Sequence, residues 1–161
     1  KAMHWMILPF RRYFDFEGRS RRMEFWMFAL LNIIVATVLA GPFFVAAIGA
    51  SIDAAASGAS EAEAELAMLE AMTGFGAIGV GLYGLYALAT IIPNISVSVR
   101  RLHDRDMSGW WYLGFIVASA VPFVGFIASL AFLVILCLPG TSGTNRFGAD
   151  PKNPYEENVF E

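Results

Sequence analysis

The chain has 161 residues, of which 57% are hydrophobic and 16% are charged, and its mean hydropathy is +0.58. These proportions exclude an ordinary soluble domain, in which about a quarter of the residues are charged. The net charge is −3 and there is one Cys, so neither a nucleic-acid partner nor a disulfide framework is expected. We predict a single all-α integral membrane domain over residues 1–161.

Residues 1–24 are predicted to lie at the cytoplasmic surface of the membrane. Within them, 5–16 mix aromatic side chains with two Arg and one Asp, which is typical of a segment at headgroup depth. Gly18 then permits a turn, Ser20 is a candidate N-cap, and Glu24 lies where the dipole of a new helix favours an acid. The alternative for 5–16 is a plain membrane-proximal tail.

The first predicted span covers residues 25–50. It has no ionisable side chain, and it exceeds the roughly 20 residues that cross a hydrocarbon core as a helix. Gly41-Pro42 predicts a kink within it. Residues 51–72 follow as an acidic external loop, in which 61–72 favour a helix by propensity.

The second predicted span covers residues 73–99. Small residues three or four positions apart share one of its helical faces, where a neighbouring helix can approach closely. Pro93-Asn94 is expected to kink or loosen the end of this span. A packing face is favoured over a pore lining. The small residues are Gly74, Ala77, Gly81, Gly84 and Ala87.

Residues 100–109, here named the polar block, are predicted to form a loop at the cytoplasmic membrane surface. They hold five charged side chains and one His between two long uncharged runs. Most basic residues of the chain lie here or before residue 24, whereas 51–72 contain acids and no Lys or Arg. By the positive-inside rule, the N-terminus and the polar block are cytoplasmic and 51–72 are external.

Residues 110–138 would be about 43 Å long as one helix, which is too long for one upright span and too short for two. Pro122 and Gly125 lie near the middle of this stretch. We favour a single bent and tilted third span, which would put the turn-rich tail, residues 139–161, outside. The alternative is four membrane helices, of which the last two form a short hairpin.

Three blocks of the sequence carry a resemblance to a known family. They are Phe-Glu-Gly-Arg-Ser-Arg-Arg-Met-Glu-Phe-Trp at 16–26, Arg-Arg-Leu-His-Asp at 100–104 with Ser-Gly-Trp-Trp at 108–111, and Pro-Gly-Thr-Ser-Gly-Thr-Asn-Arg-Phe-Gly at 139–148. In this order and spacing they resemble the bacterial inner-membrane family catalogued as domain of unknown function 805, which includes the YhaH-like proteins. The resemblance covers nearly the whole chain and implies a small multi-pass protein of the inner membrane. It implies no activity.

No catalytic site, metal site or cofactor is predicted. His103 and Asp104 are adjacent and do not face each other on a helix, and no nucleophile with an orienting partner is apparent. Only two His are present, and Cys137 lies in an apolar run. A membrane-surface enzyme and an oligomeric channel or transporter component are the alternatives, although ion pathways usually place charged groups at membrane depth.

The basic residues of the two cytoplasmic blocks beyond Lys1 are all Arg, interleaved with carboxylates. The planar guanidinium group of Arg can make paired hydrogen bonds to a carboxylate or a phosphate. The arginines can therefore be interpreted as a topology signal, as a salt-bridge network, and as a binding site for lipid or a partner, and these interpretations do not exclude one another. We predict a non-enzymatic module whose two blocks pack together and bind anionic lipid or a protein partner, including a second copy. The predicted cluster is Arg19, Arg22, Glu24, Arg100, Arg101, His103, Asp104, Arg105, Trp110 and Trp111, with a tail motif of Asn145 and Arg146.

Overall fold

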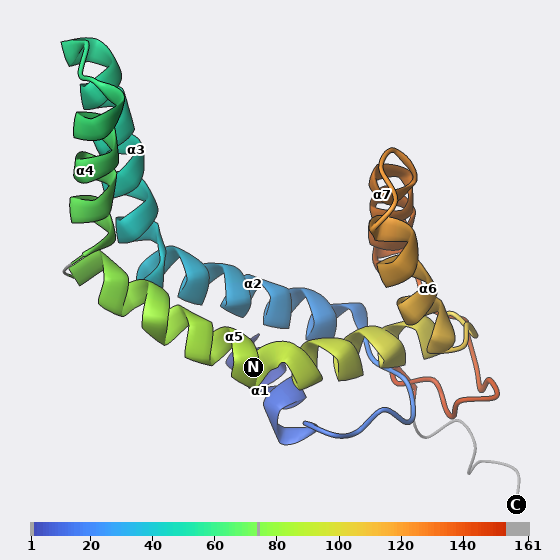
Figure 1. The fold of residues 1–161 in the computed structure, drawn as a ribbon. Helices are drawn as coiled ribbons and strands as arrows, with labels where there is room; N and C mark the ends of the chain where they lie inside the picture. The colour runs from blue at the N-terminus through green and yellow to red at the C-terminus, as the bar shows by residue number, and fades with distance from the viewer. Residues whose placement is uncertain (1, 74, 154–161) are drawn as a thin grey trace, which may run out of the picture. The chain divides into compact units, whose positions relative to one another are not determined.

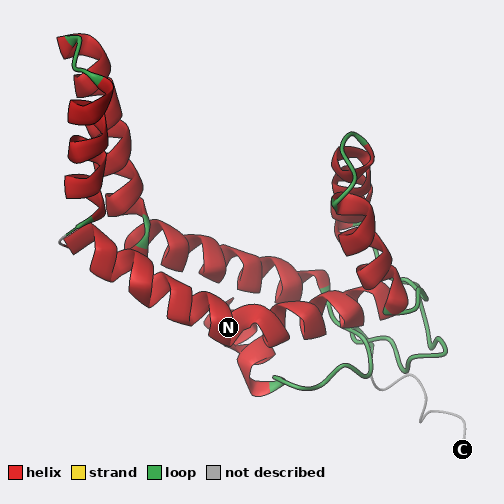
Figure 2. Ribbon diagram, in the orientation of Figure 1, coloured by secondary structure: helices red, strands yellow, loops and turns green. Residues whose placement is uncertain are grey.

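The structure is a computed structural model that describes residues 2–73 and 75–153, and in this part of the chain it has helices and no strand (Figures 1 and 2). By length and composition, α2 and α5 can cross a membrane. The predicted all-α membrane fold is confirmed. The helices are α1 (Ala2–Arg11), α2 (Arg22–Leu39), α3 (Gly41–Ser57), α4 (Glu61–Met72), α5 (Phe75–His103), α6 (Trp110–Ser119) and α7 (Val124–Cys137).

The chain forms two compact units. The first unit consists of Lys1–Ala29 and Ile91–Glu161, and the second of Leu30–Thr90, so α2 and α5 run through both. The first four residues of the polar block are the end of α5, and only the rest of it is irregular. The polar block is therefore partly helical.

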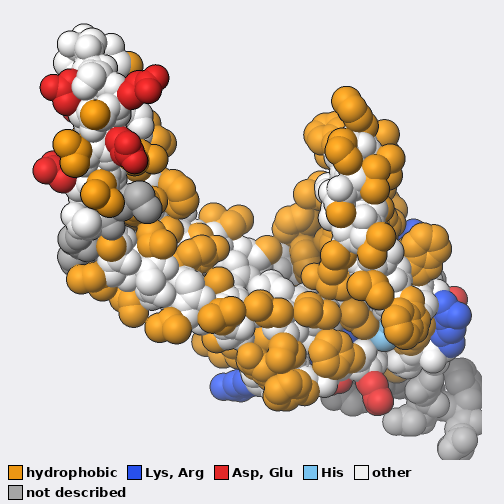
Figure 3. Space-filling model, viewed as in Figure 1, with side chains coloured by type: hydrophobic (Ala, Val, Ile, Leu, Met, Phe, Trp, Pro, Cys, Tyr) orange, Lys and Arg blue, Asp and Glu red, His pale blue; other side chains and the backbone are white. Residues whose placement is uncertain are grey.

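In the second unit, α2 ends at Leu39 and α3 begins at Gly41, so the predicted change of direction at Gly41-Pro42 is a helix break. The helix α3 continues to Ser57, into the stretch that we expected as loop. Gly58 ends α3 with a left-handed φ of 66°, and the side chains of Ser60 and Glu63 form a capping box that starts α4. The predicted helix over 61–72 is α4 itself. Acidic side chains are displayed on this helix pair (Figure 3).

The predicted small-residue face of α5 is not its packing face. Gly81 and Gly84 are exposed, and no atom of the described residues lies within 4 Å of a Cβ added at either. Contact occurs at Gly79 instead, where an added Cβ would overlap the Leu39 carbonyl oxygen. Positions two apart on a helix point about 200° apart, so Gly79 faces α2 while Gly81 faces away. Gly74, a further member of the predicted face, lies outside the described residues.

In the first unit, residues 110–138 form α6 and α7, which pack against each other (Figure 1). The structure thus has the short hairpin rather than the single bent span, because Pro122 lacks the N–H that a continuing helix requires. The tail returns to the end from which α6 departs: the N–H of Thr141 donates to the carbonyl of Asp104 at 2.8 Å. The expected position of the tail on the opposite side from the polar block is therefore wrong.

The turn between α6 and α7 pairs most of its own backbone groups. The N–H of Val121 donates to Ala118 at 3.2 Å, and the N–H of Gly125 donates to Val121 at 2.7 Å. An added Cβ at Gly125 would lie 2.5 Å from the carbonyl oxygen of Ser119, so this close turn requires glycine. At its tip Phe123 is 90% exposed. A turn that pairs its own polar groups and displays apolar side chains is compatible with a lipid environment.

We expect α6 and α7 to enter the membrane and return without crossing it. The two helices have 10 and 14 residues, and at about 1.5 Å per residue neither reaches across a core of about 30 Å. In a chain carrying Cys137→Ser, an impermeant thiol reagent should label Ser108→Cys and Ser142→Cys from the same side, and Phe123→Cys from neither side. Labelling of position 123 from the side opposite to position 108 would show a complete crossing.

Candidate functional site

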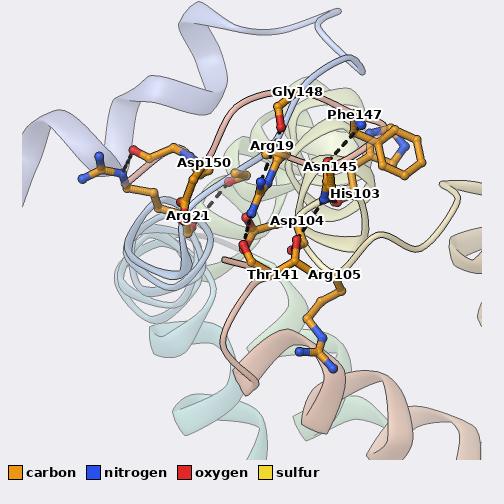
Figure 4. Close-up of polar contacts among 12 residues, drawn as sticks. Arg19, Arg21, His103, Asp104, Arg105, Thr141, Asn145, Phe147, Gly148 and Asp150 are labelled. Carbon is orange, nitrogen blue, oxygen red and sulfur yellow. Dashed lines mark hydrogen bonds and ion pairs between the residues drawn. The ribbon is translucent and has the colours of Figure 1, made fainter. Parts of the chain in front are cut away.

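Asp104, which directly follows α5, is the centre of a buried ionic cluster (Figure 4). Its Oδ1 accepts a hydrogen bond from Nε of Arg19 at 3.0 Å, and its Oδ2 accepts one from Nη1 of Arg101. All three side chains are buried. Gly140 lies so close to the carboxylate that an added Cβ would overlap it. One carboxylate therefore accepts from two guanidinium groups, which compensates for the removal of its charge from water.

Arg19 also binds the tail. Its Nη1 donates to the carbonyl of Gly143 at 2.6 Å, and its Nη2 donates to the carbonyl of Thr141. Figure 4 shows this guanidinium between Asp104 and the tail loop. Because Thr141 is also bonded to the backbone of Asp104, the N-terminal block (residues 1–24), the polar block and the tail meet at one side chain.

The tail motif holds the imidazole of His103. Nδ2 of Asn145 donates to the carbonyl of His103 at 2.9 Å. The ring of Phe147 stacks on that of His103, with centroids 3.9 Å apart and planes 4° apart, and the guanidinium of Arg146 lies 4.8 Å from the centroid of Phe147. Nδ1 of His103 lies 3.2 Å from the carbonyl oxygen of Gly18. The stack with Phe147 thus fixes the plane of the imidazole, and the contact with Gly18 fixes its Nδ1 edge.

A second buried ion pair joins α2 and α5. Oε1 of Glu24 lies 2.8 Å from Nη1 of Arg100, and the two side chains are 3% and 0% exposed. Nε and Nη2 of Arg100 have no hydrogen-bond acceptor among the described residues. Ser20 is not the N-cap of α2, which starts at Arg22; its N–H donates instead to the carbonyl of Arg100 at 3.1 Å.

Asp15 and Arg12 form an ion pair of 2.7 Å at the edge of the cluster. Burial of the carboxyl favours its neutral form, but the hydrogen bond and charge of Arg12 outweigh this effect and hold the pKa of Asp15 below its usual range. The hydroxyl of Ser96 on α5 donates to the carbonyl of Asp15 at 2.6 Å. The segment after α1 is therefore fixed to α5 close to Arg100.

Three arginines converge on the C-terminal end of α7. Arg101 donates to the carbonyl of Leu136 at 3.1 Å, Arg105 donates to Pro139 at 2.6 Å, and Arg22 donates to Cys137 at 3.4 Å. The last carbonyls of a helix lack intrahelical donors and form the negative end of its dipole, so cationic donors stabilise them. Among the described residues, Arg22 and Arg105 have no carboxylate within ion-pair distance.

The predicted cluster thus separates into buried members and exposed members. Arg22 is exposed and Arg105 is partly exposed, beside the end of α7. Trp110 and Trp111, at the start of α6, are 78% and 55% exposed. No group of three His, Cys, Asp or Glu residues that could hold a metal occurs in the described part of the chain. The buried members are Arg19, Glu24, Arg100, Arg101, His103 and Asp104.

Several partners in the cluster were not predicted from the sequence. Gly140, Thr141 and Gly143 were expected as turn residues and as part of the 139–148 block, with no role in the cluster, although two of them supply carbonyls to Arg19 and the other leaves room for Asp104. Phe147 belongs to the 139–148 block, but no contact was predicted for it. Its membership of that block and its position two residues after Asn145 are the signals that point to it.

The family described as "Protein of unknown function (DUF805)" matches residues 13–149, which include α2 to α7 and the tail loop. The chain belongs to this family. It is 37% identical over 150 residues to "Inner membrane protein YhaI" of Escherichia coli (strain K12), covering 93% of this chain and 97% of that protein. It is 35% identical over 153 residues to "Inner membrane protein YhaH" of the same strain, covering 93% and 98%. No solved structure matches. The family membership supports an inner-membrane location.

Asp104→Asn should destabilise the protein strongly. The change leaves Arg19 and Arg101 buried without their shared counter-charge, which costs about 3–5 kcal/mol. Asp106→Asn is the matched control, since Asp106 and Arg146 pair at 3.2 Å with side chains 47% and 59% exposed, and such a pair contributes less than about 1 kcal/mol. Denaturant unfolding in detergent measures both variants. Equal losses would show that Asp104 is not the centre of the network.

The pair of Glu24 and Arg100 should show strong coupling. Glu24→Leu or Arg100→Met alone leaves one charge buried without a partner, whereas the double variant removes both charges and keeps similar volumes. The double variant should therefore unfold at a higher denaturant concentration than either single variant. A double-mutant cycle in which the two losses simply add would contradict the pairing.

Proposed function

We propose that the chain is a non-enzymatic inner-membrane module whose arginine-rich face is cytoplasmic and binds anionic phospholipid headgroups. The observation that carries this proposal is the surplus of positive charge at the end of α7. Arg22 and Arg105 donate there to backbone carbonyls and have no carboxylate partner among the described residues. Carbonyl groups accept hydrogen bonds but do not neutralise a charge, so these guanidinium groups retain attraction for phosphate.

The buried arginines have a different role in this proposal. Arg19 and Arg101 share the single carboxylate of Asp104 and donate to carbonyls of the tail and of α7, so every guanidinium nitrogen of both residues already makes a hydrogen bond. We assign them to holding the polar block and the tail in place. The exposed Arg22 and the partly exposed Arg105 then lie on a fixed surface, which lowers the entropy cost of binding a headgroup.

Exposed tryptophans support the placement of this surface at headgroup depth. Trp110 and Trp111 begin α6, immediately after the polar block, and Trp26 on α2 is 39% exposed. Indole rings favour the membrane–water interface. An arginine at that depth gains about 1 kcal/mol from an anionic leaflet.

The charge distribution supports a cytoplasmic orientation. In the second unit the charged residues are acids, with no Lys or Arg, whereas the first unit contains all the arginines. Positive residues close to a membrane span are retained in the cytoplasm. The cytoplasmic leaflet carries the negative surface potential with which Arg22 and Arg105 would interact.

Replacing Arg22 and Arg105 by Gln should weaken retention of phosphatidylglycerol or cardiolipin about tenfold or more, because about 1 kcal/mol is lost for each charge. Native mass spectrometry of the purified protein measures the bound lipid. Arg12→Gln is the control, because Arg12 is already paired with Asp15 at 2.7 Å. If wild type and the double variant carry the same lipids, lipid binding by this surface is wrong, and the exposed arginines are then left for a protein partner.

A further inference from the structure

A groove of about 630 Å³ opens beside His103 in the first unit. Its long walls are one face of α5 and one face of α6. Ile95 and Val99 lie one turn apart on α5, and Leu113 and Ile116 lie one turn apart on α6. Phe16 and Tyr112 add aromatic rings to the lining, so the walls are mainly apolar, and they belong mostly to helices that enter the apolar part of the chain.

The groove has one polar end and one apolar end. Because α5 runs toward His103 and α6 runs away from Gly109, His103 and Ser108 mark the polar end, and Ile95 and Ile116 mark the apolar end. The separation along α5 from position 103 to 95 is about 12 Å. Trp110 lines the groove near its polar end. These features match an amphiphile whose head lies at the interface and whose chain extends into the membrane.

His103 presents one ring nitrogen to this groove. Nδ1 is held at the Gly18 carbonyl, and one face of the ring is covered by Phe147, but Nε2 has no hydrogen-bond partner among the described residues. A Cβ added at Gly109 would lie 3.4 Å from Nε2 and 2.7 Å from Cγ1 of Val99. Glycine at 109 therefore leaves the Nε2 edge of the ring uncovered beside the groove.

The hydrogen bond at Nδ1 determines what Nε2 can bind. A carbonyl oxygen only accepts, so Nδ1 carries the proton, and the neutral ring has its lone pair on Nε2. A ligand group that faces Nε2 must then donate a hydrogen bond, as a hydroxyl or an amine does. Arg146, which pairs with Asp106 at 3.2 Å, stacks on Phe147 next to His103, and a guanidinium at this place disfavours a second cation such as an ammonium group. A hydroxyl is therefore the favoured donor, and the anionic character of the lipid follows from the proposed function.

We infer that this groove binds one molecule of phosphatidylglycerol. A hydroxyl of the glycerol headgroup donates to Nε2 of His103, and one acyl chain lies between α5 and α6 against Val99 and Leu113. The inference rests on the proposed function, since it names the lipid that the cationic face retains. It adds that selection among anionic lipids depends on His103, whereas the attraction of anionic lipids in general depends on Arg22 and Arg105.

The test compares two lipids of equal charge and equal acyl chains. Phosphatidylglycerol has headgroup hydroxyls and phosphatidylmethanol has none, with phosphatidylcholine as the reference without net charge. Each lipid is titrated into the delipidated full chain in detergent, and binding is followed by native mass spectrometry. Wild type should bind phosphatidylglycerol about three- to tenfold more tightly than phosphatidylmethanol, the change expected for one hydrogen bond.

Two variants distinguish the head contact from the chain contact. In His103→Asn the amide can still donate to the Gly18 carbonyl while the Nε2 acceptor is lost, so the preference for phosphatidylglycerol should disappear and phosphatidylmethanol binding should be unchanged. His103→Gln is its matched control, because its amide reaches the position of Nε2 and its oxygen can restore the acceptor. In Leu113→Trp the indole fills the groove from the half-exposed face of α6, so both lipids should bind more weakly.

Each outcome has a defined consequence. Equal binding of phosphatidylglycerol and phosphatidylmethanol by wild type overturns the contact with His103, and unchanged affinities in Leu113→Trp overturn the groove as the site. If the anionic lipids bind no more tightly than phosphatidylcholine, the proposed function itself is wrong. Weaker binding of both anionic lipids by the Arg22→Gln, Arg105→Gln double variant, with the preference for phosphatidylglycerol retained, supports both proposals.

Discussion

The shared carboxylate of Asp104 is the interaction on which the first unit depends. Three segments that are far apart in the sequence meet there: Arg19 from the N-terminal block, Arg101 from α5, and the loop that contains Gly140 and Thr141. Desolvating these charges is costly, and the cost is offset only because the guanidinium groups also donate to backbone carbonyls. The packing of Gly140 on the carboxylate excludes any larger residue at that position.

The same cluster fixes the position of the short hairpin. The helices α6 and α7 are apolar on nearly all sides, so burial within the protein gives little preference for one position of the hairpin. The position is fixed at its base, where arginines donate to the last carbonyls of α7 and the tail bonds to the polar block. Hydrogen bonds between charged and polar groups thus fix the position of these helices, which in a soluble domain would be fixed by hydrophobic packing.

The sequence predicted local features and failed on long-range ones. The break at Gly41-Pro42 and the helix over 61–72 follow from backbone chemistry and capping, which act within a few residues. The contact between the N-terminal block and the polar block was predicted from their charges and their common membrane depth. The ion pair of Arg19 and Asp104 confirms this contact. The return of the tail was not predicted, because every residue has a backbone carbonyl and the sequence does not indicate which carbonyls accept hydrogen bonds from arginine. The packing through Gly79 was not predicted, because α5 contains several glycines at which a neighbouring helix could approach.

The division of the arginines into buried and exposed sets decides how substitutions can be interpreted. Arg100 and Arg101 are fully buried, and removing either leaves Glu24 or Asp104 with fewer counter-charges in a desolvated site. Loss of lipid in such a variant would report loss of the fold. Within residues 2–73 and 75–153, Arg22 and Arg105 bond only to carbonyls at the end of α7, so their charge can be removed while the buried pairs persist. A role for the arginine cluster in recognition is therefore testable only through its exposed members.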